Sequence, residues 1–227
     1  MIDVILPELP ERELALVSEE TPRPSGPTLA GRVVLGGPVA VPVTPELVGP
    51  DPELRAFLEA EANRAVYHLL HLSVTCARDA PDPALHTVNL DLTLTAEPVQ
   101  RGTTAFHPVA WSMTPRQLTE EAGGTAAAHP AHLGPRLGFL NGDHGVAPGE
   151  RICLEARREL RSDPGWELRH TPAARIGGTY RLAMVVRAPR GAVSRAAVAV
   201  GATVREGHTL HRFRSELPEP LRLAARQ

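Results

Sequence analysis

Four segments of this chain alternate apolar and polar residues with a period of two, and this pattern constrains the fold most strongly. In the clearest segment, 88–94, Val and Leu alternate with Asn, Asp and Thr. Comparable alternation runs through 70–77, 180–187 and 198–205. Because successive side chains of a strand point to opposite faces, each segment predicts a strand with one buried face. We expect 70–77 and 88–94 to form a two-stranded antiparallel unit across the Pro- and Asp-rich turn at 79–83.

Proline limits the length of any regular element in this chain. It supplies 23 of the 227 residues, and it interrupts both helices and central strands. Pro38 and Pro42 restrict the segment 32–43 to an edge strand or a bulged strand. Further strands are predicted at 98–113, 151–160, 166–170 and 210–213. The whole set predicts a mainly β fold, either an antiparallel β-sandwich or an irregular barrel.

One short helix is predicted at about 52–65. Asp51 is suited to the N-cap, Pro52 to the first helical position, and Glu53 to the positive end of the helix dipole. The apolar residues that follow recur at helical spacing, and they are Leu54, Phe57, Leu58, Ala62 and Ala65.

The domain organisation follows from the distribution of these signals. Residues 1–31 predict a peripheral N-terminal segment that ends in a Pro-rich linker. Residues 32–227 predict a single β-rich domain. Within that domain, residues 114–150 contain little regular pattern, and we expect an irregular excursion there.

Sequence motifs give little support for catalysis. All 24 basic residues are arginine, which excludes lysine-dependent chemistry such as a Schiff base or a P-loop lysine. The chain also lacks the G-x-S-x-G, H-E-x-x-H, G-x-G-x-x-G and EF-hand patterns. We therefore expect a binding or structural protein rather than an enzyme, without a catalytic residue or cofactor.

A group of histidines in the irregular excursion is the best candidate for a metal site. His129, His132, Asp143 and His144 carry side chains that bind zinc, and a zinc-bound water would make the chain a metal-dependent hydrolase. However, His129 precedes Pro130, which disfavours a helix that would align the ligands. We favour exposed loop histidines and keep the zinc hydrolase as an alternative.

Positive charge accumulates toward the end of the chain. Residues 1–150 contain 9 Arg and 19 acidic residues, for a net charge of −10, whereas residues 151–227 contain 15 Arg and 7 acidic residues, for +8. Either these charges neutralise each other within the fold, or a basic face binds an anionic partner. The candidate interaction residues are Arg181, Arg187, Arg205, Arg212, Arg214 and Phe213. With 4 Phe, 2 Trp and 2 Tyr, the chain is poor in stacking residues, so we do not expect nucleic-acid binding.

The remaining features concern compartment and membrane. Cys76 and Cys153 lie in apolar segments and predict two buried free thiols. The first residues do not resemble a signal peptide, and no apolar run approaches the roughly 18 residues of a membrane-spanning helix. We expect a cytoplasmic protein. Membrane insertion of an amphipathic hairpin is a weaker alternative, because residues 123–145 lack the alternation that a membrane-spanning strand needs.

These observations favour a non-catalytic protein-interaction or structural module. Its sheet edges, or the excursion at 114–150, would contact a partner protein or a second copy of the chain, because an open strand edge is a template for pairing.

Overall fold

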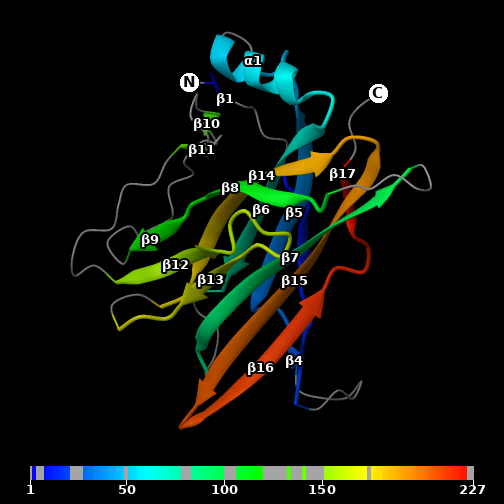
Figure 1. Ribbon diagram of the computed structural model, residues 1–227. Coiled ribbons are helices and arrows are strands. Elements are labelled where there is room, and N and C mark those ends of the chain that lie inside the picture. Colours follow the sequence, from blue (N-terminus) through cyan, green and yellow to red (C-terminus); the bar gives the residue numbers. More distant parts are fainter. Residues whose placement is uncertain are drawn as a thin grey trace.

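In the residues that it describes, the computed structural model has a mostly antiparallel β fold with one helix, which confirms the predicted fold class (Figure 1). It describes residues 8–20, 28–48, 51–77, 83–99, 106–119, 151–172 and 175–223, and the backbone of 2–3, 132–133 and 140–141. Two large sheets pack face to face and do not close into a barrel. Every pairing between the described strands is antiparallel.

The larger sheet has nine strands. In spatial order, eight of them are β4 (Thr28–Leu29), β3 (Leu16–Ser18), β16 (Thr209–Glu216), β15 (Ala192–Glu206), β7 (Leu85–Pro98), β13 (Gly165–Arg169), β12 (Ile152–Arg157) and β9 (Gln117–Thr119). The ninth, β17 (Leu221–Leu223), pairs with the beginning of β15.

The second large sheet has five strands. Their order is β2 (Glu11–Glu13), β5 (Val33–Val43), β6 (Ala65–Cys76), β14 (Gly178–Pro189) and β8 (Val109–Thr114). The register of β5 against β6 shifts between Gly36 and Val39, which confirms the bulge expected around Pro38. A separate small sheet contains β1 (Ile2–Asp3), β10 (His132–Leu133) and β11 (Leu140–Asn141).

The main core lies between the two large sheets. Alternate residues of β7 point into it, as the sequence predicted, and these are Val88, Leu90, Leu92 and Leu94. From the opposite sheet, β6 contributes Leu70, Leu72 and Val74. Burial of these side chains stabilises the sandwich by roughly 1.5–3 kcal/mol for each fully buried Leu or Val.

The predicted pairing of segments 70–77 and 88–94 is wrong. β6 pairs with β5 and β14 in the five-stranded sheet, whereas β7 pairs with β15 and β13 in the nine-stranded sheet. The connection between β6 and β7 therefore leads from one sheet to the other. A period of two specifies which face of a strand is buried, but it does not specify the neighbouring strand.

Helix α1 (Pro52–Glu61) covers part of the outer face of the five-stranded sheet. The Asp51 carboxylate caps it by accepting a hydrogen bond from the Leu54 amide at 3.0 Å, as predicted. Leu54 and Leu58 are buried in a second apolar cluster that includes residues of β6 and β14. The helix ends before the predicted residue 65, because Ala65 already pairs with Pro189 as the first residue of β6. No helix within the described residues has the length and apolar character that a bilayer crossing requires.

Part of the N-terminal segment expected to be peripheral belongs to the sandwich. β2 extends the five-stranded sheet, and β3 lies beside β16 in the nine-stranded sheet. Leu14 and Leu16 are buried in the main core. The acidic side chains of this segment stay exposed, while the two leucines between them point inward.

Candidate functional site

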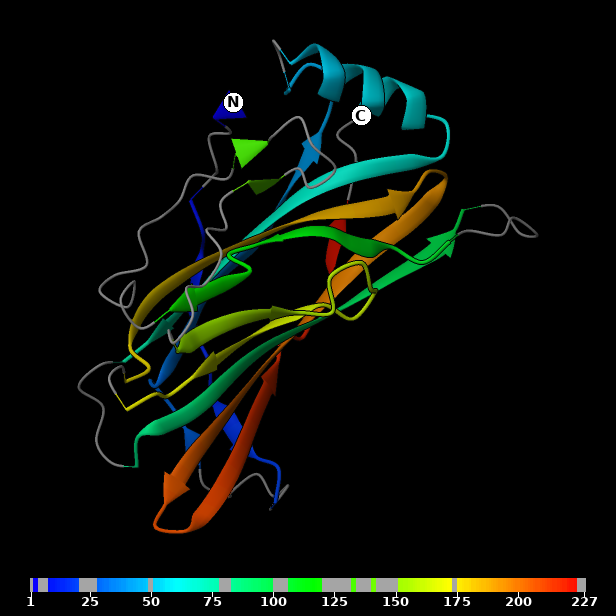
Figure 2. The same cartoon turned by 60° about the vertical axis from the view of Figure 1, so that its left-hand side comes forward.

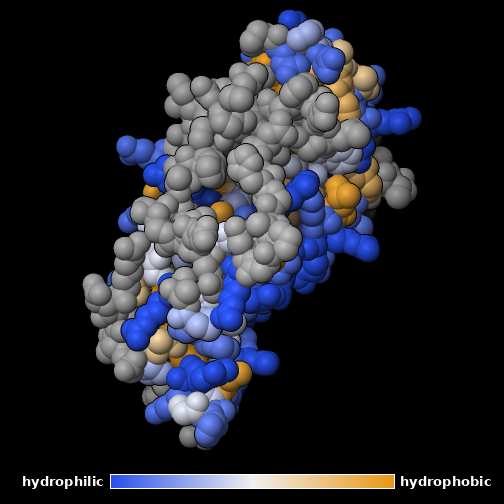
Figure 3. Space-filling view, turned by 90° about the vertical axis from the view of Figure 1, so that its left-hand side faces the viewer, coloured by the Kyte–Doolittle hydropathy of each residue, from blue (hydrophilic) through white to orange (hydrophobic). Residues whose placement is uncertain are grey.

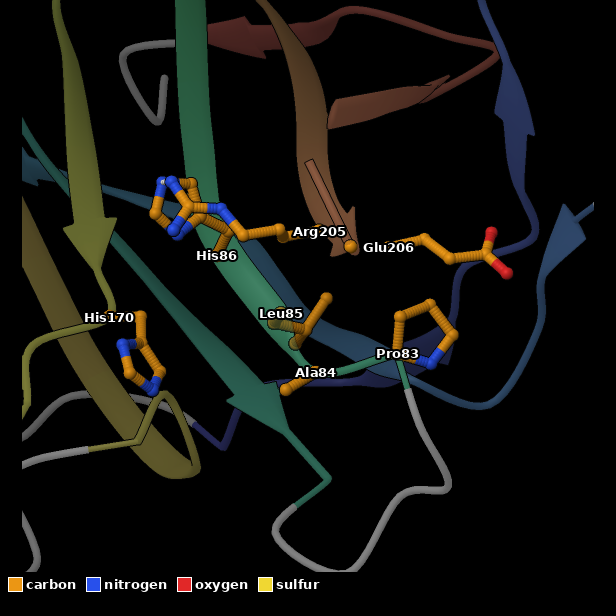
Figure 4. Close-up of a pocket in the computed structure, with 8 residues that line it drawn as sticks. Pro83, Ala84, Leu85, His86, His170, Arg205 and Glu206 are labelled. Carbon is orange, nitrogen blue, oxygen red and sulfur yellow. Dashed lines mark hydrogen bonds between the residues drawn. The ribbon is translucent and has the colours of Figure 1, made fainter. Parts of the chain in front are cut away.

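A depression of about 510 Å³ lies at one end of the nine-stranded sheet, and we call it the strand-end pocket (Figure 4). It forms where the beginning of β7, the residue after β13 and the end of β15 meet. Its lining residues are Pro83, Ala84, Leu85, His86, His170, Arg205, Glu206 and Gly207. The β15–β16 hairpin at this end and helix α1 lie at opposite ends of the molecule (Figure 2).

A β-bulge places His86 at the pocket. Leu85 pairs with Val204 and Thr87 pairs with Thr203, so His86 is an extra residue of β7 without a partner on β15. Bulges redirect a side chain from the regular alternation of a strand. The backbone amide of His170 donates to the carbonyl oxygen of His86 at 2.9 Å, which holds the ends of β7 and β13 together.

Arg205 and His86 form the polar contact of the pocket. Nη2 of Arg205 lies 3.4 Å from Nε2 of His86, and Figure 4 shows the arginine reaching toward the imidazole. Partial burial lowers the pKa of His86, and the positive charges of Arg205 and His170 lower it further. The imidazole is therefore neutral at neutral pH, and Nε2 accepts a hydrogen bond from the guanidinium.

The acidic residue of the pocket does not neutralise Arg205. Glu206 extends away from both histidines in Figure 4, and its carboxylate lies 3.7 Å from Nε2 of His211. Glu20 approaches the other nitrogen of the same ring at 3.4 Å. Among the described residues, no carboxylate forms an ion pair with Arg205.

The described lining suits binding of an anion. A guanidinium donates several hydrogen bonds in a fixed plane, and an imidazole can add another donor when protonated. Pro83, Ala84 and Leu85 give the pocket an apolar side. None of the eight lining residues carries a hydroxyl or a thiol, so none of them supplies a nucleophile of the Ser, Thr or Cys type.

Of the predicted interaction residues, only Arg205 lies in the strand-end pocket. Arg187 is partly buried against Glu61, at 2.8 Å, and its guanidinium lies 4.5 Å from the centre of the Phe106 ring. These contacts connect the end of α1 to β14, so Arg187 has a structural role. Arg181 lies exposed on β14.

The prediction that Phe213 contacts a partner is wrong. Its side chain is 6% exposed and belongs to the main core, because it points inward from β16. Its neighbours Arg212 and Arg214 point outward, as alternation along a strand requires. Arg214 forms an ion pair with Glu216 at 3.0 Å.

The proposed metal ligands fall almost entirely outside the described residues. This applies to His129, Asp143 and His144, whereas the backbone of His132 lies in β10, paired with Asp3 and Asn141. The zinc site therefore stays a prediction. Within the described part of the chain, no group of three or more potential ligands is arranged to hold a metal ion.

Cys76 and Cys153 are buried and neither belongs to a disulfide, as predicted. They lie in different sheets, Cys76 on β6 and Cys153 on β12. The Cys153 thiol donates weakly to the carbonyl oxygen of Leu118 at 3.4 Å.

Comparison with known proteins adds no functional assignment. No family model matches the sequence, and no curated protein matches it. A solved structure described as "Pore forming protein" is similar over 83% of this chain and 82% of that chain, with 7% sequence identity and a TM-score of 0.27. A TM-score this low does not support any conclusion about this chain.

Proposed function

We propose that this chain is a non-catalytic interaction module that binds an acidic segment of a partner protein at the strand-end pocket. The observation that supports this proposal is the position of Arg205. Its exposed guanidinium lies in a depression beside two half-buried imidazoles, and no described carboxylate pairs with it. A carboxylate of a partner would provide the missing counter-charge.

The surroundings of the pocket favour a protein segment as the ligand. Residues 205–210, which form the end of the β15–β16 hairpin, are all exposed. Leu210 is 42% exposed and offers an apolar contact on the same hairpin. On the side of the molecule shown in Figure 3, the described surface is mostly hydrophilic with scattered apolar residues, which suits polar recognition better than burial of a large apolar face.

A second copy of the chain is one candidate partner. Residues 1–150 carry a net charge of −10, so acidic segments are abundant in the chain itself. Contact between such a segment and the pocket of another copy would join two different surfaces. A contact of this kind produces rings or open chains rather than a symmetric dimer.

Two measurements on the full-length chain test the proposal. Fluorescence anisotropy with a labelled oligoglutamate peptide tests binding of an acidic segment, with an oligoserine peptide as the negative control. Size-exclusion chromatography with light scattering tests self-association. We expect Arg205→Ala to weaken peptide binding by about fivefold or more, which corresponds to loss of a charge-assisted hydrogen bond.

Arg181→Ala provides the matched control, because it removes the same charge from another exposed position, on the other sheet. We expect this variant to bind the peptide as the wild-type chain does. The proposal is wrong if a monomeric chain fails to bind oligoglutamate at low ionic strength. It is also wrong if both arginine variants lose the same amount of affinity, since the interaction would then depend on net charge alone.

A further inference from the structure

Three cationic or protonatable side chains from different strands meet at the strand-end pocket. His86 comes from the bulge of β7, His170 directly follows β13, and Arg205 lies near the end of β15. Backbone pairing fixes all three positions: Arg205 pairs with Leu210 in the β15–β16 hairpin, and the His170 amide is bonded to His86. The strand framework therefore fixes the backbone positions that carry these three side chains before any ligand arrives.

We propose that the strand-end pocket binds one oxyanion, a carboxylate or a phosphate group, between Arg205 and the two histidines, and that His86 takes up a proton on binding. This inference rests on the proposed function, because it specifies the ligand group and the pH dependence of the same pocket. The proton comes from the solvent and ends the hydrogen bond that Nε2 of His86 accepts from Arg205, so both side chains then donate to the oxyanion. Binding therefore becomes tighter as the pH falls.

Oxyanion binding and protonation of His86 favour each other because of the charges around this residue. In the free protein, partial burial, Arg205 and His170 all lower the pKa of this imidazole. A bound oxyanion offsets the charge of Arg205 and favours a positive charge on the ring, so it raises the pKa of His86. By linkage, a ligand that raises the pKa of a group binds more tightly when that group is protonated.

The other charged groups around the pocket leave this coupling intact. On β13, Arg169 forms ion pairs with Glu167 of the same strand and with Glu155 of the neighbouring β12. At the end of β15, Glu206 extends away from His86 and lies close to His211 of β16. Among the described residues, the charged neighbour that contacts His86 is Arg205.

The size of the pocket indicates that the oxyanion belongs to a larger ligand. A single oxyanion occupies on the order of 100 Å³, which is a few times the volume of a water molecule. The strand-end pocket measures about 510 Å³, and its apolar side is formed by Pro83, Ala84 and Leu85. This side can contact the carbon atoms that carry the carboxylate or the phosphate.

Sulfate is a suitable probe because its charge does not change in the pH range of histidine. Its affinity for the full-length chain is measured by calorimetry at about pH 7.5 and about pH 5.5, at constant ionic strength, with chloride as the reference anion. The ring signals of His86 are followed by NMR in the same samples. We expect sulfate to bind at least about threefold more tightly at the lower pH and to raise the midpoint of the His86 titration.

Two variants distinguish the parts of the proposal. Arg205→Ala should abolish measurable sulfate binding, whereas Arg181→Ala should leave it unchanged. His86→Gln should retain weaker binding with a smaller pH dependence, because glutamine donates a hydrogen bond but does not titrate. Parallel titrations with acetate and inorganic phosphate identify which oxyanion the pocket prefers. Equal sulfate affinity of the wild-type chain at both pH values, or an unchanged pH dependence in His86→Gln, would overturn the inference.

The same experiments separate this inference from the proposed function. If sulfate binds with the expected dependence on pH and Arg205 but oligoglutamate does not bind, the oxyanion site stands and the protein-interaction module is wrong. If oligoglutamate binding depends on Arg205 but neither ligand shows a pH dependence, the module stands and the proton uptake is wrong.

Discussion

His68 should make the stability of this fold sensitive to mild acid. The residue lies on the inner face of β6, in line with Leu70 and Leu72, and it is 1% exposed. Neither nitrogen of its ring has a hydrogen-bond partner among the described residues. Because burial disfavours the charged ring, the pKa of His68 is lowered from 6.5 to about 4.

The magnitude follows from the difference in pKa between the folded and unfolded chains. The depressed pKa means that the folded state keeps His68 neutral, while the unfolded chain binds a proton below about pH 6.5. The part of the folding stability that depends on a neutral His68 is therefore fully present above pH 6.5 and is lost as the pH falls toward about 4. Below about pH 6.5 the free energy of unfolding falls by about 1.4 kcal/mol per pH unit. This slope flattens near pH 4, where the folded chain also takes up the proton, so the loss by pH 4 is about 3 kcal/mol.

The substitution His68→Leu isolates this contribution, because leucine is apolar and does not titrate. Urea unfolding of the wild-type and variant chains between about pH 7 and about pH 4 gives the two free energies of unfolding. As the pH falls across this range, the wild-type chain should lose about 3 kcal/mol more of its free energy of unfolding than His68→Leu does. Since the pKa of His71 and the pKa of His86 are also lowered, the wild-type chain should lose more than His68 alone explains.

His208→Gln serves as the control, because it removes an exposed histidine from the β15–β16 turn without touching the core. The reasoning is refuted if His68→Leu and the wild-type chain lose stability in parallel as the pH falls. In that case the buried imidazole would not be responsible for the acid sensitivity.

Three further substitutions or reactions test local features of the fold. Leu160 has a left-handed backbone (φ 63°) and is 59% exposed, so Leu160→Asn should raise the free energy of unfolding by about 0.5–1 kcal/mol in urea unfolding. A Cβ atom at Gly165 would lie 2.5 Å from the carbonyl oxygen of Leu90, so Gly165→Ala should lower the melting temperature and cost about 1–3 kcal/mol. Burial raises the pKa of the Cys76 thiol to about 12, so this cysteine should react with a thiol reagent only after denaturation; rapid labelling of the native chain at Cys76 would contradict its burial.

Local patterns were sufficient to predict the fold class and the beginning of the helix. Alternation in β7 reflects burial on one face, and the contact of Asp51 with the Leu54 amide reflects an ordinary capping preference. The partners of the strands were not predictable in this way. β6 is buried on both faces, with His71 and Ser73 7% and 6% exposed on its outer side, so its apparent alternation did not mark a polar surface.

The strand-end pocket could not be predicted from the sequence as a whole, because its residues come from three distant segments. One local feature of the sequence, the spacing of the apolar residues at the beginning of β7, does indicate its position. The buried positions of β7 follow an even phase from Val88 to Leu94, whereas the next buried residue upstream is Leu85. Two inward-facing residues three positions apart require an irregularity between them, and the bulge at His86 supplies it. The change in the alternation between Leu85 and Val88 therefore marks the bulge in the sequence. Because Leu85 is buried, His86 becomes the extra residue of the bulge and lies beside Arg205. A sequence that kept the even phase through position 86 would extend the regular ladder and would not place an imidazole at this end of the sheet.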